Sequence, residues 1–371
     1  MTKYLRRTNF LNALYLEESW SVVLRCVSKL ELLQLVGQGV PDVDLQASGK
    51  HRNSKKTHQN NQINNLSETA CQSVVKAVDT IFTRSCGLEG DAVVHFAKAL
   101  CEVSSEELFV TKPARMFSLQ KLVEISYYNM GRVRFQWQKF WMVVGDHFQK
   151  AACSENSKVS MYAVDSLRQI SLKFLEKGEL KNFRFQKEFL RPFEIIVRGG
   201  RNLVVRDLVV RCAQQFVEAR APALRSGWRN ILAVLGAASH EPALANIAFP
   251  VVVRCALELQ NGEVQLHSLA PSWNDLVKCL GDFAVTSEEH SMESLKILRN
   301  LSDKVGNKDL FEKENIATDE RLPDLPLDDR VWARAWFPLL FELTTIITRS
   351  SLDVRTRALS VQSGGSKDKL K

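Results

Sequence analysis

The residues best suited to catalysis, seven histidines and eight cysteines, are scattered singly along the chain. No two histidines lie four residues apart, as the zinc-binding HExxH helix requires, and no GxSxG sequence is present to hold a serine nucleophile. The cysteines form no CxxC pair, and most have apolar neighbours at helical spacing, which is typical of reduced, buried thiols. The enzymatic alternative is a cysteine and histidine dyad assembled from distant helices, which no local pattern supports. We therefore predict neither a metal site nor a catalytic centre.

Loops that bind nucleotides or dinucleotides are not recognisable either. The single Gly-Lys pair, Gly49-Lys50, has Asp44 where a P-loop needs its first glycine and His51 where it needs Ser or Thr. The sequence Gly37-Gln38-Gly39 lacks the third glycine of the dinucleotide fingerprint and follows a helical pattern, which favours a helix C-cap. No cofactor is predicted.

The strongest functional signal is a basic segment. Residues 177–229 hold twelve Lys or Arg against five acids, which accounts for nearly all of the net charge of +8. Clustered cations on helices attract phosphate-bearing or acidic surfaces. The residues that we predict to bind an anionic surface are Arg184, Lys187, Arg191, Arg206 and Arg211.

Three interpretations of the basic segment stay open. The cations form a solvated helix face, paired with acids such as Glu188, Glu194 and Asp207. Alternatively they contact an anionic membrane or an acidic partner protein. Nucleic acid is disfavoured because aromatic residues that would stack on bases recur at helical spacing, which predicts their burial. These residues are Phe183, Phe185, Phe189 and Phe193.

The elements that position this segment are predicted from a repeated stripe. A tryptophan followed by apolar residues three, four and seven positions later lies on one helix face. This pattern occurs five times, at Trp20, Trp137, Trp228, Trp273 and Trp336. Trp228 and Trp273 are 45 residues apart, and Trp137 and Trp228 are 91 residues apart, about two such units. HEAT and armadillo repeats have about 40 to 47 residues, so the period predicts an α-solenoid.

Each striped helix needs a second helix to pack against it. The predicted second helices are residues 157–174, 243–259 and 291–305, with a further one that begins at Asp353. A unit without a tryptophan is predicted at 183–197 and 204–217. Alternating strand patterns are almost absent, and the single Asn-Gly pair follows a helical pattern. The predicted fold is all-α, an α-solenoid of HEAT- or armadillo-like helical repeats.

The predicted organisation follows from composition. No stretch reaches the roughly 18 to 20 uninterrupted apolar residues of a membrane span, so no transmembrane segment is predicted. Two polar stretches and a glycine-containing tail interrupt the helical pattern. The predicted parts are a first helical unit (1–40), a disordered polar loop (41–66), central helical repeats (67–305), a linker (306–328), a last, truncated repeat (329–359) and a disordered tail (360–371).

Long stretches of the chain resemble a known family. MFSLQKLVEISYYNMGRVRFQWQKFWMVVGDHF (116–148) and AVDSLRQISLKFLEKGELKNFRFQKEFLRPFE (163–194) closely resemble the region downstream of the catalytic domain in the large, brefeldin A-inhibited exchange factors for Arf GTPases. The resemblance is weaker over residues 241–328. It also includes residues 19–40, 206–212, 226–231 and 329–359.

The resemblance implies a regulatory role without catalysis. In the family, a separate helical domain carries the exchange glutamate in a Phe-Arg-Leu-Pro-Gly-Glu type loop, and no such sequence occurs here. Leu322-Pro323-Asp324 lies in the predicted linker. The family's downstream regions are helical repeats that regulate membrane recruitment and can engage Arf in its GTP form. The implied partners are therefore an Arf-type small GTPase, an anionic membrane surface and other proteins, with no nucleic acid, at the cytoplasmic side of trans-Golgi or endosomal membranes.

An unrelated helical-repeat adaptor or transport receptor, which binds a peptide or nucleic acid, is the alternative function. The two ends of the chain depart from the family pattern, at residues 1–14 and after Leu359. This departure predicts a fragment, a splice form or an incomplete gene model. It also predicts marginal stability for residues 330–359, because the last repeat would lose much of its second helix.

Overall fold

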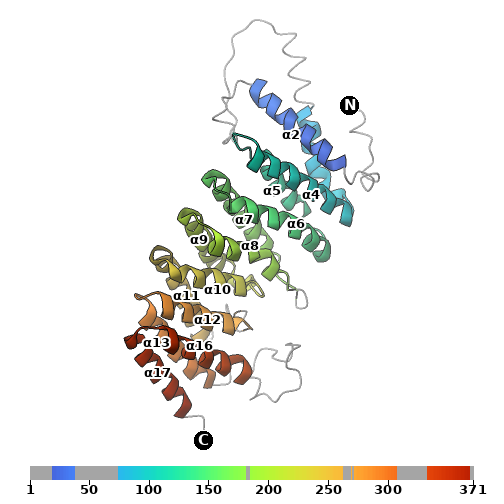
Figure 1. Ribbon diagram of the computed structural model, residues 1–371. Coiled ribbons are helices and arrows are strands. Elements are labelled where there is room, and N and C mark those ends of the chain that lie inside the picture. The colour runs from blue at the N-terminus through green and yellow to red at the C-terminus, as the bar shows by residue number, and fades with distance from the viewer. Residues whose placement is uncertain are drawn as a thin grey trace, which may run out of the picture. The chain divides into compact units, whose positions relative to one another are not determined.

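The computed structural model describes residues 19–37, 74–180, 184–261, 269, 271–306 and 332–367. All regular elements in these ranges are helices, and no strand occurs among them (Figure 1). The all-α helical-repeat fold predicted from the tryptophan stripes is confirmed. The predicted polar loop (41–66) and nearly all of the predicted linker (306–328) lie outside the described residues.

The chain divides into two compact units, Met1–Ser166 and Leu167–Lys371. The boundary falls within helix α7, whereas the sequence predicted one continuous central part over 67–305. The first unit contains a helix over residues 74–83. Its other elements are α2 (Ser19–Gly37), η3 (Arg84–Gly87), α4 (Gly90–Ser105), the π-turn η4 (Glu106–Val110), α5 (Phe117–Asn129) and α6 (Arg134–Ala152). Helix α7 (Ser157–Leu175) begins in the first unit and ends in the second.

The core of the first unit lies around α4, which packs against α2, α5 and α6. Trp20 of α2 meets the ring of Phe96 of α4 edge-on, with the ring centroids 4.9 Å apart. In α6, Trp137 stacks with Phe140 and Trp141 and is fully buried. Two of the predicted tryptophan stripes therefore form the hydrophobic contacts of this unit.

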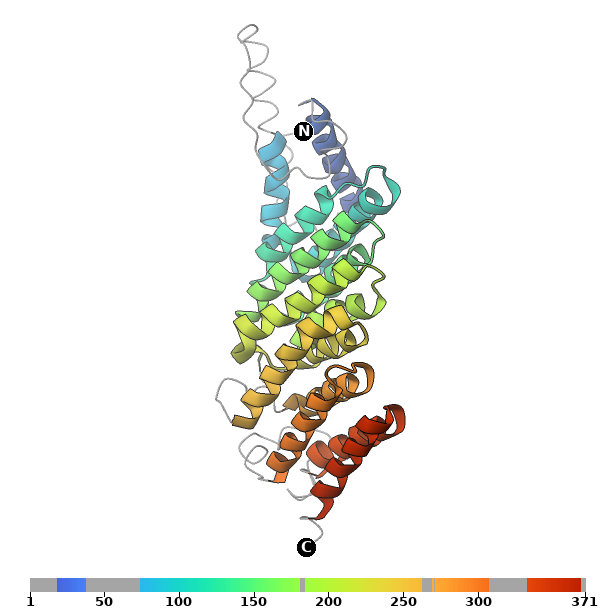
Figure 2. The same ribbon diagram turned by 90° about the vertical axis from the view of Figure 1, so that its left-hand side faces the viewer.

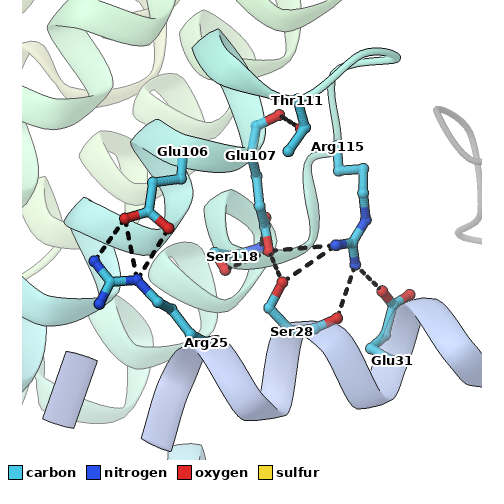
Figure 3. Close-up of polar contacts among 8 residues, drawn as sticks. All are labelled: Arg25, Ser28, Glu31, Glu106, Glu107, Thr111, Arg115 and Ser118. Carbon is cyan, nitrogen blue, oxygen red and sulfur yellow. Dashed lines mark hydrogen bonds and ion pairs between the residues drawn. The ribbon is translucent and has the colours of Figure 1, made fainter. Parts of the chain in front are cut away.

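A buried polar cluster attaches α2 to the corner between α4 and α5 (Figure 3). Glu107, only 3% exposed, accepts hydrogen bonds from the hydroxyls of Ser28 and Ser118 and from the Ser118 backbone N–H. Arg115 is also buried and donates to the Ser28 carbonyl and to the Glu31 carboxylate. Because a buried charge is costly unless it is paired and hydrogen-bonded, this cluster fixes how α2 packs.

The second unit has two layers of helices. One layer consists of helices that pack side by side in the order α8, α10, α12 and α16. The other layer consists of α9, α11, α13 and α17, and this second layer faces the viewer in Figure 2. The elements are α8 (Gln186–Gly199), α9 (Leu203–Arg220), η5 (Ala221–Ala223), α10 (Trp228–Ala237), η6 (Ala238–His240), α11 (Pro242–Asn261), α12 (Trp273–Thr286), α13 (Ser291–Gly306), the π-turn η9 (Trp332–Trp336), α16 (Phe337–Arg349) and α17 (Leu352–Lys367). Each predicted second helix in this unit is observed within a few residues of its expected bounds.

The 45-residue period has a structural basis in the second unit. Helices α10 and α12 each begin at their tryptophan, Trp228 and Trp273, and both side chains are buried. The Trp273 indole N–H donates to the carbonyl of Ala335, with 3.2 Å between Nε1 and the oxygen. A tryptophan at this position therefore links its helix to the next one in the same layer.

The fifth stripe is shifted in phase. Trp336 is half-buried, and the buried side chains are Ala335, Leu339, Leu343 and Ile346. The π-turn η9 precedes α16, and its wider turn, with i→i+5 hydrogen bonds, changes which residues face the core. The sequence prediction assumed the 3.6-residue turn of regular α-helix, so it could not include this shift.

The last helix ends later than the sequence predicted. Helix α17 continues to Lys367, beyond Leu359, and so includes most of the residues predicted to form a disordered tail. Val354, Ala358 and Val361 are all buried at i, i+4 and i+7, so the apolar stripe that holds the helix in place continues past Leu359. Residues 368–371 lie outside the described residues.

Candidate functional site

Helix α8 separates apolar and charged side chains sharply. Its buried side includes Phe189, Phe193 and Ile196, next to Phe185 just before the helix. This burial confirms the expectation for three of the four phenylalanines, whereas Phe183 lies outside the described residues. The cations and acids of α8 consequently lie on the opposite side of the helix, toward solvent.

A polar joint fixes the start of α8 against the start of α10. The Glu179 carboxylate accepts hydrogen bonds from the backbone N–H groups of Gln186 and Ser226, both at 2.8 Å, and from the Ser226 hydroxyl at 2.6 Å. The Gln186 side chain accepts from the Arg225 N–H at 2.8 Å and donates to the Ala223 carbonyl at 2.9 Å. The first backbone N–H groups of a helix have no acceptor within the helix, and burying one without a hydrogen bond costs free energy. Because the joint supplies these acceptors, it determines the relative position of the two helices.

Gly227 lies at the centre of the joint. A Cβ atom there would be 2.9 Å from Leu190 Cδ1 and 3.1 Å from the Gln186 side-chain oxygen. A larger residue at position 227 would therefore require the Leu190 and Gln186 side chains to shift. The close approach of Gly227 to α8 places the first turn of α10 beside the first turn of α8.

The five predicted cations are not gathered on one surface. Arg184 is exposed just before α8, Lys187 is half-exposed on its first turn, and Arg191 is exposed one turn later, 3.9 Å from Glu188. Arg206 of α9 instead donates from Nε to the carbonyl of Val197 at 3.0 Å, and so closes the turn between α8 and α9. Arg211 is exposed on α9, with Nε 2.8 Å from Asp207 Oδ2. Because α8 and α9 belong to different layers, Arg191 and Arg211 lie on different sides of the unit.

Cations from other helices join the α8 group. Arg229 is exposed on the first turn of α10, and Lys278 is exposed on α12. Asp275 of α12 lies within electrostatic range of both: burial raises its pKa, and Arg229, Lys278 and Lys187 oppose the rise. Three neighbouring helices of one layer thus contribute positive charge around Asp275, while the Glu194 carboxylate of α8 adds to the rise in its pKa. We call Arg184, Lys187, Arg191 and Arg229 the α8–α10 basic surface.

The predicted binding residues did not include Arg229, which is the last cation of the basic segment, or Lys278, which lies beyond that segment. The tryptophan stripe could have predicted that Arg229 is exposed. A residue directly after a buried Trp at the start of a helix lies about 100° around the helix and therefore outside the apolar stripe.

The arrangement suits recognition of an anionic surface by charge. Exposed guanidinium and ammonium groups bind carboxylates or phosphates and are screened by salt. In the described ranges, no three His, Cys, Asp or Glu side chains are placed to hold a metal ion. None of the described helices is long and apolar enough to cross a bilayer.

Comparisons with known proteins identify this part of the chain. Residues 173–254 match the family model described as "Mon2/Sec7/BIG1-like, HDS". Residues 173–254 are an HDS region of this family. The HDS region contains the whole polar joint, with Glu179, Gln186 and Ser226, and all four residues of the α8–α10 basic surface.

Relatives extend the similarity beyond the HDS region. The human brefeldin A-inhibited guanine nucleotide-exchange protein 1 is 44% identical over 94% of this chain. The ADP-ribosylation factor guanine nucleotide-exchange factors sec71 of Schizosaccharomyces pombe and SEC7 of Saccharomyces cerevisiae are 34% and 31% identical, each over 93% of this chain. The chain spans about a fifth of the length of these relatives, 20%, 20% and 19% respectively. It is therefore a region of the Arf exchange-factor type, and the HDS region lies within it.

Proposed function

We propose that this chain is a non-catalytic regulatory region of an Arf exchange factor, which binds an Arf-type GTPase in its GTP form through the α8–α10 basic surface. The observation that carries the proposal is the coincidence of the HDS region with that surface. The match to the family covers residues 173–254, and every cation of the surface lies in this range. The names of the relatives connect the family with Arf-type GTPases.

Electrostatics supports a partner with an acidic patch. The cations of the α8–α10 basic surface come from two helices that the Glu179 joint holds together, so the backbone positions that carry them are fixed before a partner arrives. A backbone that is already ordered adds no further loss of backbone entropy on binding. Charges of this kind mainly raise the association rate and contribute to specificity, and their effect decreases with salt.

The proposed site of action is the cytoplasmic side of Golgi-type membranes, in vesicle-mediated transport. Binding of Arf in its GTP form would couple the region to the product of exchange, because exchange converts the GDP form into the GTP form. Contact with other proteins and with anionic lipid belongs to the same proposal. No catalytic role is assigned to any residue of this chain.

A nucleotide-resolved binding assay tests the proposal. The full chain is immobilised, and an Arf-type GTPase is applied once with GDP and once with a non-hydrolysable GTP analogue. We expect binding of the GTP form at least about tenfold tighter than binding of the GDP form, with affinity that falls as salt is raised. Equal binding of both forms, or no binding of either, would exclude this function. Tight binding of a peptide or RNA without GTPase dependence would favour the helical-repeat adaptor instead.

A further inference from the structure

Helix α16 carries large apolar side chains on its exposed side. Phe337 is 58% exposed and Phe341 is 60% exposed, and their rings stack with centroids 6.3 Å apart at an interplanar angle of 27°. Trp332, at the start of the π-turn η9, is 53% exposed. We call Trp332, Phe337 and Phe341 the α16 apolar face. Three large rings exposed within ten residues are unusual on a soluble surface and mark a contact site.

The two phenylalanines lie on one face of α16. They are four residues apart in α-helix, and their rings stack on each other. Trp332 is exposed at the first residue of the π-turn η9, which leads into α16. The exposed aromatic surface therefore consists of the stacked pair and of Trp332 in the turn before it.

The rest of this side of α16 offers no charge and few free polar groups. Between Phe337 and Arg349, the sole acid is Glu342, which lies against α12: its Oε2 would be 2.6 Å from a Cβ at Gly281. The threonine hydroxyls that follow the rings all donate to backbone carbonyls of the same helix. These bonds run from Thr344 to Leu340, from Thr345 to Phe341 and from Thr348 to Thr345. With their hydroxyls turned back toward the helix, the threonines leave mainly methyl groups on the outside.

Guanidinium groups lie at the C-terminal end of this side. Arg349 is the exposed last residue of α16. Arg355 of α17 is held at the turn that follows α16 by a hydrogen bond from Nη2 to the Ser350 carbonyl at 3.2 Å. Leu352, 73% exposed, and the exposed Asp353 begin α17 at the same turn. The aromatic side chains are thus followed along the chain by two arginines and one acid.

We propose that the α16 apolar face contacts an anionic lipid bilayer, with the three rings in the headgroup region and the two arginines that follow them on lipid phosphates. This inference rests on the proposed function as a membrane-associated regulatory region and names the surface that touches the membrane. Aromatic side chains favour the membrane–water interface, where an apolar ring lies beside polar headgroups. Arginines near an anionic leaflet are attracted by its negative surface potential.

Lipid fits this face better than a protein partner does. Protein interfaces contain about one hydrogen bond per 100 to 200 Å², so a protein-binding face of this length presents free donors or acceptors. Here the threonine hydroxyls are occupied by their own helix. Acyl chains and headgroup boundaries require no directional hydrogen bonds from the inserted rings. The exposed Arg349 and Arg355 are complementary to anionic headgroups.

Vesicle sedimentation with the full chain tests the inference. The vesicles contain phosphatidylcholine alone or phosphatidylcholine with phosphatidylserine. The test variant is the double substitution Phe337→Ser/Phe341→Ser. Its matched control is Phe135→Ser/Met142→Ser on α6, because those side chains are 60% and 62% exposed and lie in the first unit. Since all four side chains are already exposed, both variants are expected to fold, which circular dichroism checks.

We expect the wild type and the α6 control to bind the anionic vesicles, and the α16 variant to bind them at least about tenfold more weakly. Equal sedimentation of the α16 variant and the wild type would overturn the inference, as would no sedimentation of the wild type. If the α16 substitutions instead dissociate a dimer in size-exclusion chromatography, or weaken GTPase binding without changing vesicle binding, the face binds protein and the inference is wrong. GTPase binding in solution is measured separately, so failure of this inference and failure of the proposed function give different results.

Discussion

The carboxylate of Glu179 receives two hydrogen bonds from Ser226, 47 residues away: one from the backbone N–H at 2.8 Å and one from the hydroxyl at 2.6 Å. A third bond, from the Gln186 N–H at 2.8 Å, makes Glu179 the acceptor for the starts of two helices. These helices carry the α8–α10 basic surface. The joint is therefore the structural element on which the proposed binding surface depends.

Substitution Glu179→Ala should lower the free energy of unfolding of the second unit by about 2 to 4 kcal/mol, because three donors lose their acceptor. Thermal unfolding followed by circular dichroism measures this loss. Glu218→Ala is the control, since Glu218 is exposed on α9 and accepts a single bond from Gln214. It should leave the unfolding midpoint almost unchanged. Equal midpoints for both variants would show that the joint does not stabilise this unit.

Gly227→Ala should destabilise the same joint by about 1 to 3 kcal/mol, because the new methyl group overlaps Leu190 and Gln186. Gly199→Ala, at the end of α8, is the matched control: a Cβ there meets no atom within 4 Å. We expect the control to unfold at the wild-type urea concentration or slightly above it. A Gly227→Ala protein as stable as the control would contradict the close approach.

The first unit should lose stability in acid through His147. Its ring nitrogen Nε2 shares a hydrogen bond with the Ser104 hydroxyl at 2.9 Å, and Nδ1 shares one with the Ser105 hydroxyl at 3.4 Å. Burial, together with Lys150, lowers the pKa of His147 from 6.5 to about 4. The unfolded state therefore binds the proton more tightly, so stability falls as pH decreases from about 6.5 to about 4, by about 2 to 3 kcal/mol. Urea unfolding at several pH values should show this fall in the wild type and a smaller one in His147→Gln; identical curves would contradict it.

Glu342 should have the opposite pH dependence. Burial, with the neighbouring Asp282 carboxylate, raises the pKa of Glu342 from 4.5 to about 7, while Lys278 and Arg349 oppose the rise. The folded state binds the proton more tightly here, so stability of the second unit decreases as pH rises from about 4.5 to about 7. Because Glu342 is partly exposed, we reduce the expected size of the effect to about 1 to 2 kcal/mol. Glu342→Gln should raise the urea midpoint at pH 8 above that of the wild type; a lower midpoint would show that the charged carboxylate stabilises the fold.

Local periodicity predicted the helices of the second unit individually, whereas α4 and α5 of the first unit were included only in the general prediction of helical repeats. The stripes of Trp137, Trp228 and Trp273 predicted buried helix faces, because apolar spacing reflects packing directly. The π-turn that ends at Trp336 was not predictable from a 3.6-residue period. The end of α17 was not predictable either, because it depends on the burial of Val361, which lies beyond the expected boundary at Leu359. For α17 the difference comes from packing, which the local pattern does not contain.

The sequence predicted which segment holds the cations of the candidate site, but not how these cations are arranged in space. The charge surplus located the basic segment, but it did not separate Arg191 from Arg211, because two antiparallel helices of a pair expose their cations on different layers. It also did not connect Glu179 with Ser226, whose contact joins two repeats. Such long-range polar contacts have no periodic signal in a single sequence.

The affinities of Arg191→Glu and Arg211→Glu for the GTP form of an Arf-type GTPase test the central claim most directly. The two arginines are closely matched: their side chains are 64% and 57% exposed, and each is paired with an acid on its own helix. We predict that Arg191→Glu, on the α8–α10 basic surface, weakens binding by up to about tenfold at low salt, while Arg211→Glu, on the other layer, binds like the wild type. Equal losses in both variants, or a loss in Arg211→Glu alone, would contradict the assignment of the GTPase to this surface.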